Sequence, residues 1–243
     1  DSCEGEYDVE EVTEVEGFEP TVTSDQNGGF VITNTKYTHL TVNKTWEKRD
    51  TTEIPRSLWL QLVCVEGNDR RQIGSQVTMR PDENGNWSYT FNNLKVSECA
   101  NYDVDEYLGY NDNFQETTHT KVDATTVNLT NKEIIYIPIQ KYWSTAEDTV
   151  LPDEIEVSLF CGATDNQDNL VDTLTLRKSS DYYGVFGPFF YDSCESGYNV
   201  QEDTVLADFG VSIEEDANGY GFTITNTEQV DLTVRKVWDN TSG

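Results

Sequence analysis

The chain has 243 residues and a formal net charge of −29, from 45 acidic and 16 basic residues. This charge repels nucleic acids and anionic lipid surfaces, so it excludes nucleic-acid binding and favours solubility of a long polypeptide. Aromatic residues make up 12% of the chain, which argues against disorder despite a mean hydropathy of −0.61, because alternating strands need only one apolar face.

The sequence predicts β-strands throughout and no convincing amphipathic helix. Alternation of apolar and polar residues places a first series of strands at 39–46, 56–66, 75–80, 87–93, 101–108, 114–121 and 125–133. A second series follows at 135–143, 154–162, 171–178, 183–190, 198–205, 208–215 and 219–227. About seven strands in about 96 residues predict an all-β fold of tandem Ig-like β-sandwiches.

Landmark residues recur at a nearly constant interval, which indicates an array of similar domains. Cys3, Cys99 and Cys194 are separated by 99 − 3 = 96 and 194 − 99 = 95 residues, and Cys64 and Cys161 by 161 − 64 = 97. The phase of the repeat predicts four segments. Residues 1–37 match the last part of a truncated repeat, 38–134 and 135–229 are complete repeats, and 230–243 are the first strand of a further truncated repeat.

No signal peptide, anchoring motif or long apolar run is recognised in the sequence. We therefore expect no membrane span in this segment and interpret it as an internal piece of a longer secreted polypeptide.

Each repeat opens with a strand that carries a lysine on its apolar face. In "LTVNKTW" (residues 40–46), Lys44 shares a face with Val42 and Trp46, because successive side chains in a strand point to opposite faces. The same pattern places Lys141 in "IPIQKYW" and Lys236 in "LTVRKVW". One such lysine is explained by a stem that lies on the core while the amine reaches water, but three at one period indicate a shared requirement.

Two further polar residues break the apolar face at the same period. Each last strand carries an inward asparagine, and each "Y-x-V-x-E"-like strand carries an inward glutamate. The asparagines are Asn34, Asn131 and Asn226, and the glutamates are Glu11, Glu106 and Glu202. Each complete repeat therefore directs one lysine, one glutamate and one asparagine into a common interior.

Two interpretations of this set remain open from the residues alone. A buried ion pair with a hydrogen-bonded amide needs no chemistry, although burying charges costs several kcal/mol per ion before pairing. Alternatively, desolvation favours a neutral lysine and a protonated glutamic acid, so that the amine attacks the asparagine, the acid shuttles protons and ammonia leaves. The product is an amide that joins the first strand of the repeat to the last.

At these residues the chain resembles the CnaB-type domains of Gram-positive surface adhesins and pilins. Their repeats open with a V-x-K-x-W-like strand, carry a Y-x-V-x-E strand and close with an F-x-I-T-N-like strand. The resemblance covers essentially the whole chain and implies a spontaneous isopeptide bond in each complete repeat. The implied residue sets are Lys44, Glu106 and Asn131, and Lys141, Glu202 and Asn226.

The residues of the incomplete repeats have no full set within the chain. We expect Glu11 and Asn34 to belong with a lysine upstream of residue 1, and Lys236 with an asparagine beyond residue 243.

The cysteines depart from what the family leads us to expect. Cys64 and Cys161 occupy the same inward place in their repeats, and the recurrence predicts disulfides Cys64–Cys99 and Cys161–Cys194. Buried free thiols are the alternative. Cys3 is expected to lack a partner here because that partner lies upstream.

Four Asn-X-Ser/Thr sequons are candidate glycosylation sites, at Asn43, Asn86, Asn128 and Asn240. Asn43 and Asn128 lie on the outward face of their strands, which a glycan requires.

The function that we expect is structural: an extracellular stalk, fibre or adhesin shaft at the cell surface or in a cell-wall appendage. Its partners would be neighbouring repeats, identical chains in a fibre, or a host or matrix ligand. The alternative is an adhesin module that recognises a protein or glycan through its loops. We expect no cofactor, no metal and no conventional enzyme activity, since no zinc spacing or phosphate loop occurs and neither His39 nor His119 recurs with the repeat.

Overall fold

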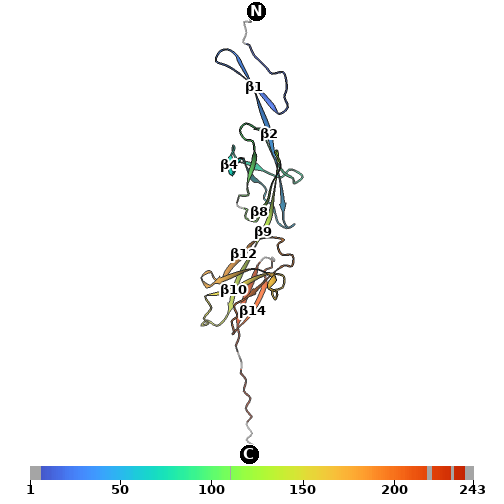
Figure 1. Cartoon of the computed structure of the whole chain (residues 1–243). Coiled ribbons are helices and arrows are strands. Elements are labelled where there is room, and N and C mark those ends of the chain that lie inside the picture. Colours follow the sequence, from blue (N-terminus) through green and yellow to red (C-terminus); the bar gives the residue numbers. More distant parts are fainter. Residues whose placement is uncertain (1–6, 110, 218–220, 231–232, 239–243) are drawn as a thin grey trace, which may run out of the picture. The chain divides into compact units, whose positions relative to one another are not determined.

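The computed structural model describes residues 7–109, 111–217, 221–230 and 233–238 (Figure 1). The described residues form strands and two short 3-10 turns, η1 (Gln167–Asn169) and η2 (Lys178–Ser180), with no α-helix among them. The chain divides into two compact units, Asp1–Glu133 and Ile134–Gly243.

The first sheet of unit 1 brings the two ends of the predicted repeat together. It contains β2 (Phe30–Glu47), β6 (Trp87–Lys95), β8 (Phe114–Asp123) and the first part of β9 (Thr126–Ser144), in the order β6–β2–β9–β8. The outer pairings are antiparallel, whereas β2 and β9 are parallel neighbours. The lysine strand and the asparagine strand of the repeat therefore lie side by side.

The second sheet of unit 1 is built around β3 (Leu58–Glu66). On one side β3 pairs with β7 (Tyr102–Tyr107), and on the other with β4 (Asp69–Gln72) and β5 (Val77–Met79). Strand β4 was not predicted, because all four of its side chains are polar or charged and exposed and so show no apolar alternation. It folds back on β3 through Gly67, whose φ of 65° suits glycine.

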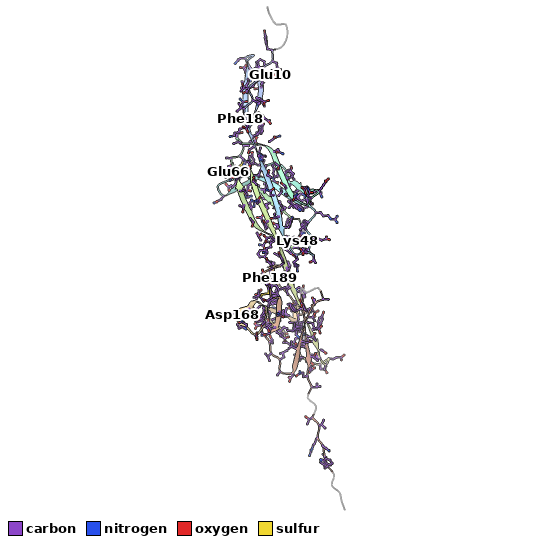
Figure 2. The ribbon with its side chains drawn as sticks, turned by 90° about the vertical axis from the view of Figure 1, so that its right-hand side faces the viewer. Glu10, Phe18, Lys48, Glu66, Asp168 and Phe189 are labelled. Carbon is purple, nitrogen blue, oxygen red and sulfur yellow. A yellow bond between two sulfur atoms is a disulfide. The ribbon has the colours of Figure 1, made fainter. Side chains whose placement is uncertain are left out.

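The start of β2 pairs with another strand, β1 (Phe18–Ser24), in the order Phe18↔Lys36 to Ser24↔Phe30. Phe18 is labelled in Figure 2 at the start of this hairpin. The strand expected at 39–46 is therefore the second part of a longer strand. Apolar side chains such as Ile32 and Val31 remain exposed on the hairpin part.

Unit 2 repeats the plan of unit 1. Its first sheet runs β12 (Tyr183–Phe190), the second part of β9, β15 (Phe222–Glu228) and β14 (Phe209–Glu215). The β9–β15 pairing is again parallel. Its second sheet runs β11 (Leu170–Arg177), β10 (Glu154–Cys161) and β13 (Tyr198–Glu202).

Each unit has its own apolar core, formed by the inward residues of its strands. In unit 1 the core includes Leu40, Leu60, Val104 and Leu129, and in unit 2 it includes Ile139, Val157, Leu159 and Ile224. Burial of an aliphatic side chain of this size stabilises the fold by about 1.5–3 kcal/mol. The tandem β-sandwich fold expected from the sequence is confirmed.

The largest differences from the expected strands lie at residues 125–143 and 233–238. The strands expected at 125–133 and 135–143 form the single strand β9, because residues 132–136 ("KEIIY") contain no glycine or proline that would end a strand. Residues 233–238, expected to open a further repeat, are not in a strand, since no described strand supplies them with backbone hydrogen bonds.

Candidate functional site

The parallel strand pair places lysine and asparagine as diagonal neighbours on the inner face. In unit 1, Lys44 pairs in register with Leu129, and Trp46 pairs with Asn131. Asn131 therefore lies one inward position beyond the partner of Lys44, a distance that a long lysine side chain can span. Unit 2 has the same offset.

The glutamate approaches from the facing sheet. Glu106 lies on β7 and pairs in register with Leu60 of β3, a strand whose inward residues fill the core. Its carboxylate accepts a hydrogen bond from Lys44 Nζ at 3.2 Å through Oε2, and one from Asn131 Nδ2 at 3.2 Å through Oε1. The glutamate thus bridges the lysine and the asparagine.

The side chains of the first set are withdrawn from water. The Lys44 side chain is 0% exposed, that of Glu106 4%, and Asn131 as a residue 1%. Such a burial is rare for lysine and requires a partner.

The second set repeats the arrangement. The Lys141 and Glu202 side chains are 0% and 1% exposed, with Lys141 Nζ 3.5 Å from Glu202 Oε2. Asn226 Nδ2 donates to Glu202 Oε1 at 2.8 Å. The lysine also donates to the Tyr142 carbonyl at 3.1 Å, and its longer approach to Glu202 leaves Oε2 without a hydrogen bond of good geometry.

Burial changes the acid–base properties of these groups. Desolvation lowers the pKa of Lys44 to about 8, with Glu106 opposing the shift, and it lowers the pKa of Lys141 to about 8, with Glu202 opposing it. Desolvation also raises the pKa of Glu106 above its usual value, although Lys44 acts against it. The environment therefore favours the neutral amine and the neutral acid relative to water.

A tryptophan covers each lysine. The Lys44 amine lies 4.7 Å from the ring centre of Trp46, and the Lys141 amine lies 4.2 Å from that of Trp143. Further rings surround the tryptophans edge-on: Trp87 and Phe114 around Trp46, and Tyr182 and Phe209 around Trp143. These rings exclude water from the site.

The amide oxygens of both asparagines are buried and have no hydrogen-bond partner. Rotation of the Asn131 amide by half a turn exchanges its nitrogen and oxygen, so a protonated Glu106 would then donate to the oxygen that is now unpaired. The same applies to Asn226 and Glu202. An unpaired acceptor next to an acid that can become a donor is a suitable arrangement for polarising the carbonyl group.

Two segments outside these sets contain parts of the same arrangement. Asn34 Nδ2 donates to Glu11 Oε1 at 3.2 Å, as in the complete sets, and Asn34 is exposed. Lys236 lies 3.7 Å from the ring centre of Trp238, and both are exposed.

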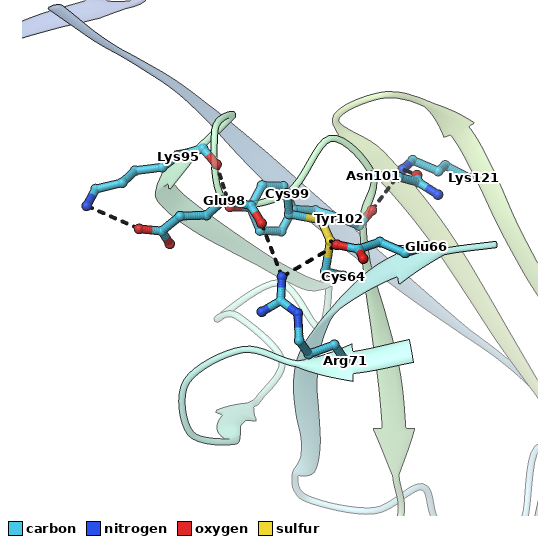
Figure 3. Close-up of a disulfide and its surroundings, with 9 residues drawn as sticks. All are labelled: Cys64, Glu66, Arg71, Lys95, Glu98, Cys99, Asn101, Tyr102 and Lys121. Atoms are coloured by element: carbon cyan, nitrogen blue, oxygen red, sulfur yellow. Dashed lines mark hydrogen bonds and ion pairs between the residues drawn. A yellow bond between two sulfur atoms is a disulfide. The ribbon is translucent and has the colours of Figure 1, made fainter. Parts of the chain in front are cut away.

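Both expected disulfides are formed. Cys64 near the end of β3 bonds to Cys99 before β7, 35 residues later in sequence (Figure 3). Cys161 at the end of β10 bonds to Cys194 before β13, 33 residues later. Cys3 lies outside the described residues.

The chain around the first disulfide is also tied by polar contacts (Figure 3). The Tyr102 hydroxyl donates to the Lys95 carbonyl at 2.8 Å, and Arg71 donates to the Glu98 carbonyl at 3.1 Å. The disulfide thereby fixes the segment that leads into β7, the strand that carries Glu106.

Three of the four sequon asparagines are described. Asn43 and Asn128 face each other across β2 and β9, and Asn43 Nδ2 donates to Asn128 Oδ1 at 3.1 Å. Asn86 is exposed in a turn, where Asp82 accepts a hydrogen bond from its side chain. Asn240 lies outside the described residues.

Sequence reasoning missed two carboxylates near the sites. Glu133 and Glu228 lie two residues after Asn131 and Asn226, on the same face of their strands, and both accept hydrogen bonds from the loop after the lysine strand. Their separation of 228 − 133 = 95 residues is the signal that would have found them.

A family model described as the Cna protein B-type domain matches residues 40–132 and again 137–227. A curated relative, the collagen adhesin of Staphylococcus aureus, is 26% identical over 256 residues. The alignment covers 96% of this chain but only 20% of the relative, so the chain spans about a fifth of that protein.

Similar solved structures include two B repeat units of the collagen binding protein of S. aureus, at 19% identity and a TM-score of 0.36, covering 90% of this chain and 58% of that one. Another is the pilus backbone from Streptococcus pneumoniae, at 11% identity and a TM-score of 0.28, covering 82% and 69%. The two matches of the family model together span most of the sequence, one in each unit. The chain belongs to the Cna protein B-type domain family.

Proposed function

We propose that this chain is a structural segment of an extracellular surface stalk, fibre or adhesin, whose complete repeats are locked by Lys–Asn isopeptide bonds. The observation that carries the proposal is the paired arrangement of buried lysine, glutamate and asparagine, built twice with the same strand offset. A buried ion pair alone would be costly to maintain in both repeats and would need no neighbouring amide.

The reaction starts with a proton transfer. Lys44 passes a proton from Nζ to Glu106 across their 3.2 Å hydrogen bond, which leaves a neutral amine and a neutral acid. The lone pair of Nζ attacks Cγ of Asn131 while the acid keeps its proton and donates a hydrogen bond to the amide oxygen, which takes up the negative charge until the carbonyl re-forms as ammonia leaves. Glu106 then carries a proton from Nζ to the amide nitrogen, and ammonia leaves. Glu202 has the same role for Lys141 and Asn226.

The product connects the strands through which the chain enters and leaves a repeat. Because β2 and β9 are parallel neighbours, the new amide lies between two strands of one sheet and unlike a disulfide is not reduced. Each complete repeat would become a closed covalent loop. The reaction occurs once per repeat, so the chain would act on itself and not as a turnover enzyme.

The proposed repeats are the segments 38–134 and 135–229, with parts of neighbouring repeats at 1–37 and 230–243. Under this proposal the partners are the adjoining repeats and identical chains in a fibre. The similarity to a staphylococcal adhesin and to pilins supports a location on the cell surface. Recognition of a host protein or glycan through the loops remains the alternative, which binding to a glycan array or to matrix proteins would test.

Intact mass tests the crosslink directly. Each bond releases one ammonia, about 17 Da, because the amine replaces the amide nitrogen. After reduction and deglycosylation we expect the wild-type chain to be about 34 Da lighter than calculated, and Glu106→Ala to be lighter by about half of that. The full calculated mass in the wild type would exclude the bonds.

A further inference from the structure

A carboxylate follows each asparagine of the complete sets, buried in unit 1 and partly buried in unit 2. Glu133 lies two residues after Asn131, and Glu228 lies two residues after Asn226, so each shares the face of its asparagine. Glu133 is 2% exposed as a residue. Neither carboxylate takes part in the proton transfers described above.

In unit 1, Glu133 holds the loop that follows the lysine strand. The Arg49 backbone N–H donates to Oε2 at 2.9 Å, the Arg49 guanidinium donates to Oε1, and the Thr52 hydroxyl donates to Oε1 at 2.7 Å. Burial alone would raise the pKa of Glu133, but these hydrogen bonds outweigh it and hold the pKa below its usual value. The carboxylate is therefore ionised and fully engaged at neutral pH.

Unit 2 has the corresponding contacts. The Ala146 backbone N–H donates to Glu228 Oε2 at 3.0 Å, and the Thr149 hydroxyl donates to the same oxygen at 2.9 Å. Thr149 lies 149 − 52 = 97 residues after Thr52, the interval that separates Lys141 from Lys44.

The loops that receive these contacts also have the same local conformation. The Thr52 N–H donates to the Arg49 carbonyl at 3.1 Å, and the Thr149 N–H donates to the Ala146 carbonyl at 3.2 Å. A backbone donor and a threonine hydroxyl at the two ends of a turn therefore meet one carboxylate in both repeats. The arginine at the first position is specific to unit 1, so the shared part is the backbone and the threonine.

The contacts matter because backbone pairing does not by itself select the register of the lysine strand. A one-residue slip between β2 and β9 would turn Lys44 out of the core, but a two-residue slip would keep every side chain on its face. Such a slip would move the amine by about 6–7 Å relative to Asn131. The contacts between Glu133 and the Arg49–Thr52 turn tie β9 to the segment that follows the end of β2, in the register that sets Lys44 beside Asn131.

We propose that Glu133 and Glu228 are positioning residues for the crosslink, which hold the lysine strand and the asparagine strand in the reactive register. This inference rests on the proposed function. The residue two positions after Asn34 is Lys36. The glutamate at this position is therefore found in the two complete repeats and not in the N-terminal partial repeat.

The test measures the rate of crosslinking in each repeat separately. The full chain is unfolded before it has reacted, refolded, and sampled over time, and the two crosslinked peptides are quantified by mass after digestion. We expect Glu133→Ala to slow the Lys44–Asn131 bond by about 10- to 100-fold, because misplacement by an ångström or more has that effect on intramolecular reactions. The Lys141–Asn226 bond of the same molecules is the internal control and should keep the wild-type rate.

Matched variants separate positioning from general destabilisation. Glu228→Ala should slow only the second bond. Glu133→Gln keeps a single side-chain oxygen, which can accept from the Arg49 N–H or from the Thr52 hydroxyl but does not replace both carboxylate oxygens, so it should restore part of the rate in the first. Leu94→Ala, a core truncation opposite Thr38 of β2 and therefore far along β2 from the Arg49–Thr52 turn, should lower stability without this loss of rate. If Glu133→Ala does not refold, the rate of the Lys44–Asn131 bond is measured in Thr52→Ala, which removes only one of the contacts.

The possible outcomes are distinct. Wild-type rates of the first bond in Glu133→Ala or Thr52→Ala, with crosslinking intact elsewhere, would overturn the positioning role and leave the proposed function standing. Absence of both bonds in the wild type would overturn the two together.

Discussion

The reactive state of the site differs from the ion pair only in where one proton lies. A neutral lysine beside a protonated glutamic acid holds as many protons as an ammonium beside a carboxylate. The pair therefore titrates as a unit, and the fraction of the reactive form does not change with pH while the pair holds one shared proton. Lys44 and Glu106 are close enough for this coupling, at 3.2 Å.

The crosslinking rate is accordingly expected to have a plateau. Below the raised pKa of Glu106 both groups are protonated, and above a pH of about 8 the Lys44 amine loses the shared proton, so the rate should fall on both sides. Refolding of unreacted chain across pH 4–10, followed by mass spectrometry, gives the profile. A rate that keeps rising above pH 9 would contradict the role of Glu106 as a proton carrier.

A titratable residue outside the site, His119, is expected to affect the stability of the fold and not the crosslinking reaction. A hydrogen bond to Asp103, at 2.8 Å, and an ion pair with Glu116, at 3.6 Å, raise the pKa of His119 to about 9 from an ordinary value of 6.5. Because the folded state binds the proton more tightly, the stabilisation is complete below pH 6.5 and is lost as the pH rises through about 9. His119→Gln should therefore destabilise unit 1 at pH 6 and have less effect at pH 10.

Urea unfolding of both proteins at the two pH values measures this difference. His39→Gln, at an exposed position, is the matched control. An equal loss of stability at pH 6 and pH 10 would show that the His119 ion pairs contribute nothing.

The site residues were predictable because strand parity and the repeat interval act together. Parity assigns Lys44, Glu106 and Asn131 to the inner face, and the interval shows that their polarity is not accidental. Glu133 escaped the same reasoning because it falls in the polar "NKE" segment, where one strand was expected to end and the next to begin. Its contacts come from a loop, and loop conformation leaves no periodic signal in the sequence.

At the scale of elements, some strands of the structure differ from those expected. The long strand β9 serves as the last strand of one sheet and the first of another, and its buried side chains lie at odd-numbered positions in both parts. Two separate strands were expected because the boundary between the predicted repeats falls inside β9. Strand β4 has no apolar face, and its pairing with β3 depends on the turn at Gly67. The alternation of apolar and polar residues therefore predicts strands that contribute to a core, but it does not predict strands that only add backbone hydrogen bonds.

The disulfides act at this scale, because each fastens the strand in the middle of a sheet to the segment before the glutamate strand. Closing a loop of 35 residues between Cys64 and Cys99 stabilises the fold by about 4 kcal/mol through the entropy of the unfolded chain. The double variant Cys64→Ala/Cys99→Ala should lose about that much in a Glu106→Ala background. The loss should be smaller in the crosslinked chain, where the enclosing loop is already closed.

Urea unfolding monitored by tryptophan fluorescence measures both values. The pair Cys161→Ala/Cys194→Ala in a Glu202→Ala background is the matched control, with a loop of 33 residues. An equal loss with and without the crosslink would show that the two covalent loops do not constrain the same unfolded chain.

For the whole molecule, the proposed bonds determine how far it extends under tension. The chain enters the proposed repeat 38–134 within β2 and leaves it within β9, and the paired parts of these strands are parallel, so pulling shears the pair. A bond between Lys44 and Asn131 would carry this tension directly. The segment between these two residues, which are 131 − 44 = 87 positions apart in sequence, would then stay folded under force.

Single-molecule pulling of the chain from its two ends should show three lengths for this repeat. Glu106→Ala under reducing conditions should release about 300 Å, since an extended chain spans at most about 3.3–3.6 Å per residue. With the Cys64–Cys99 disulfide intact, which withholds 35 residues, the same variant should release the length of 87 − 35 = 52 residues, about 180 Å. The wild type should release neither length, because the amide bypasses the folded residues and is insensitive to the reductant. A wild-type repeat that gains about 300 Å when reduced would mean that its entry and exit strands are held by hydrogen bonds alone.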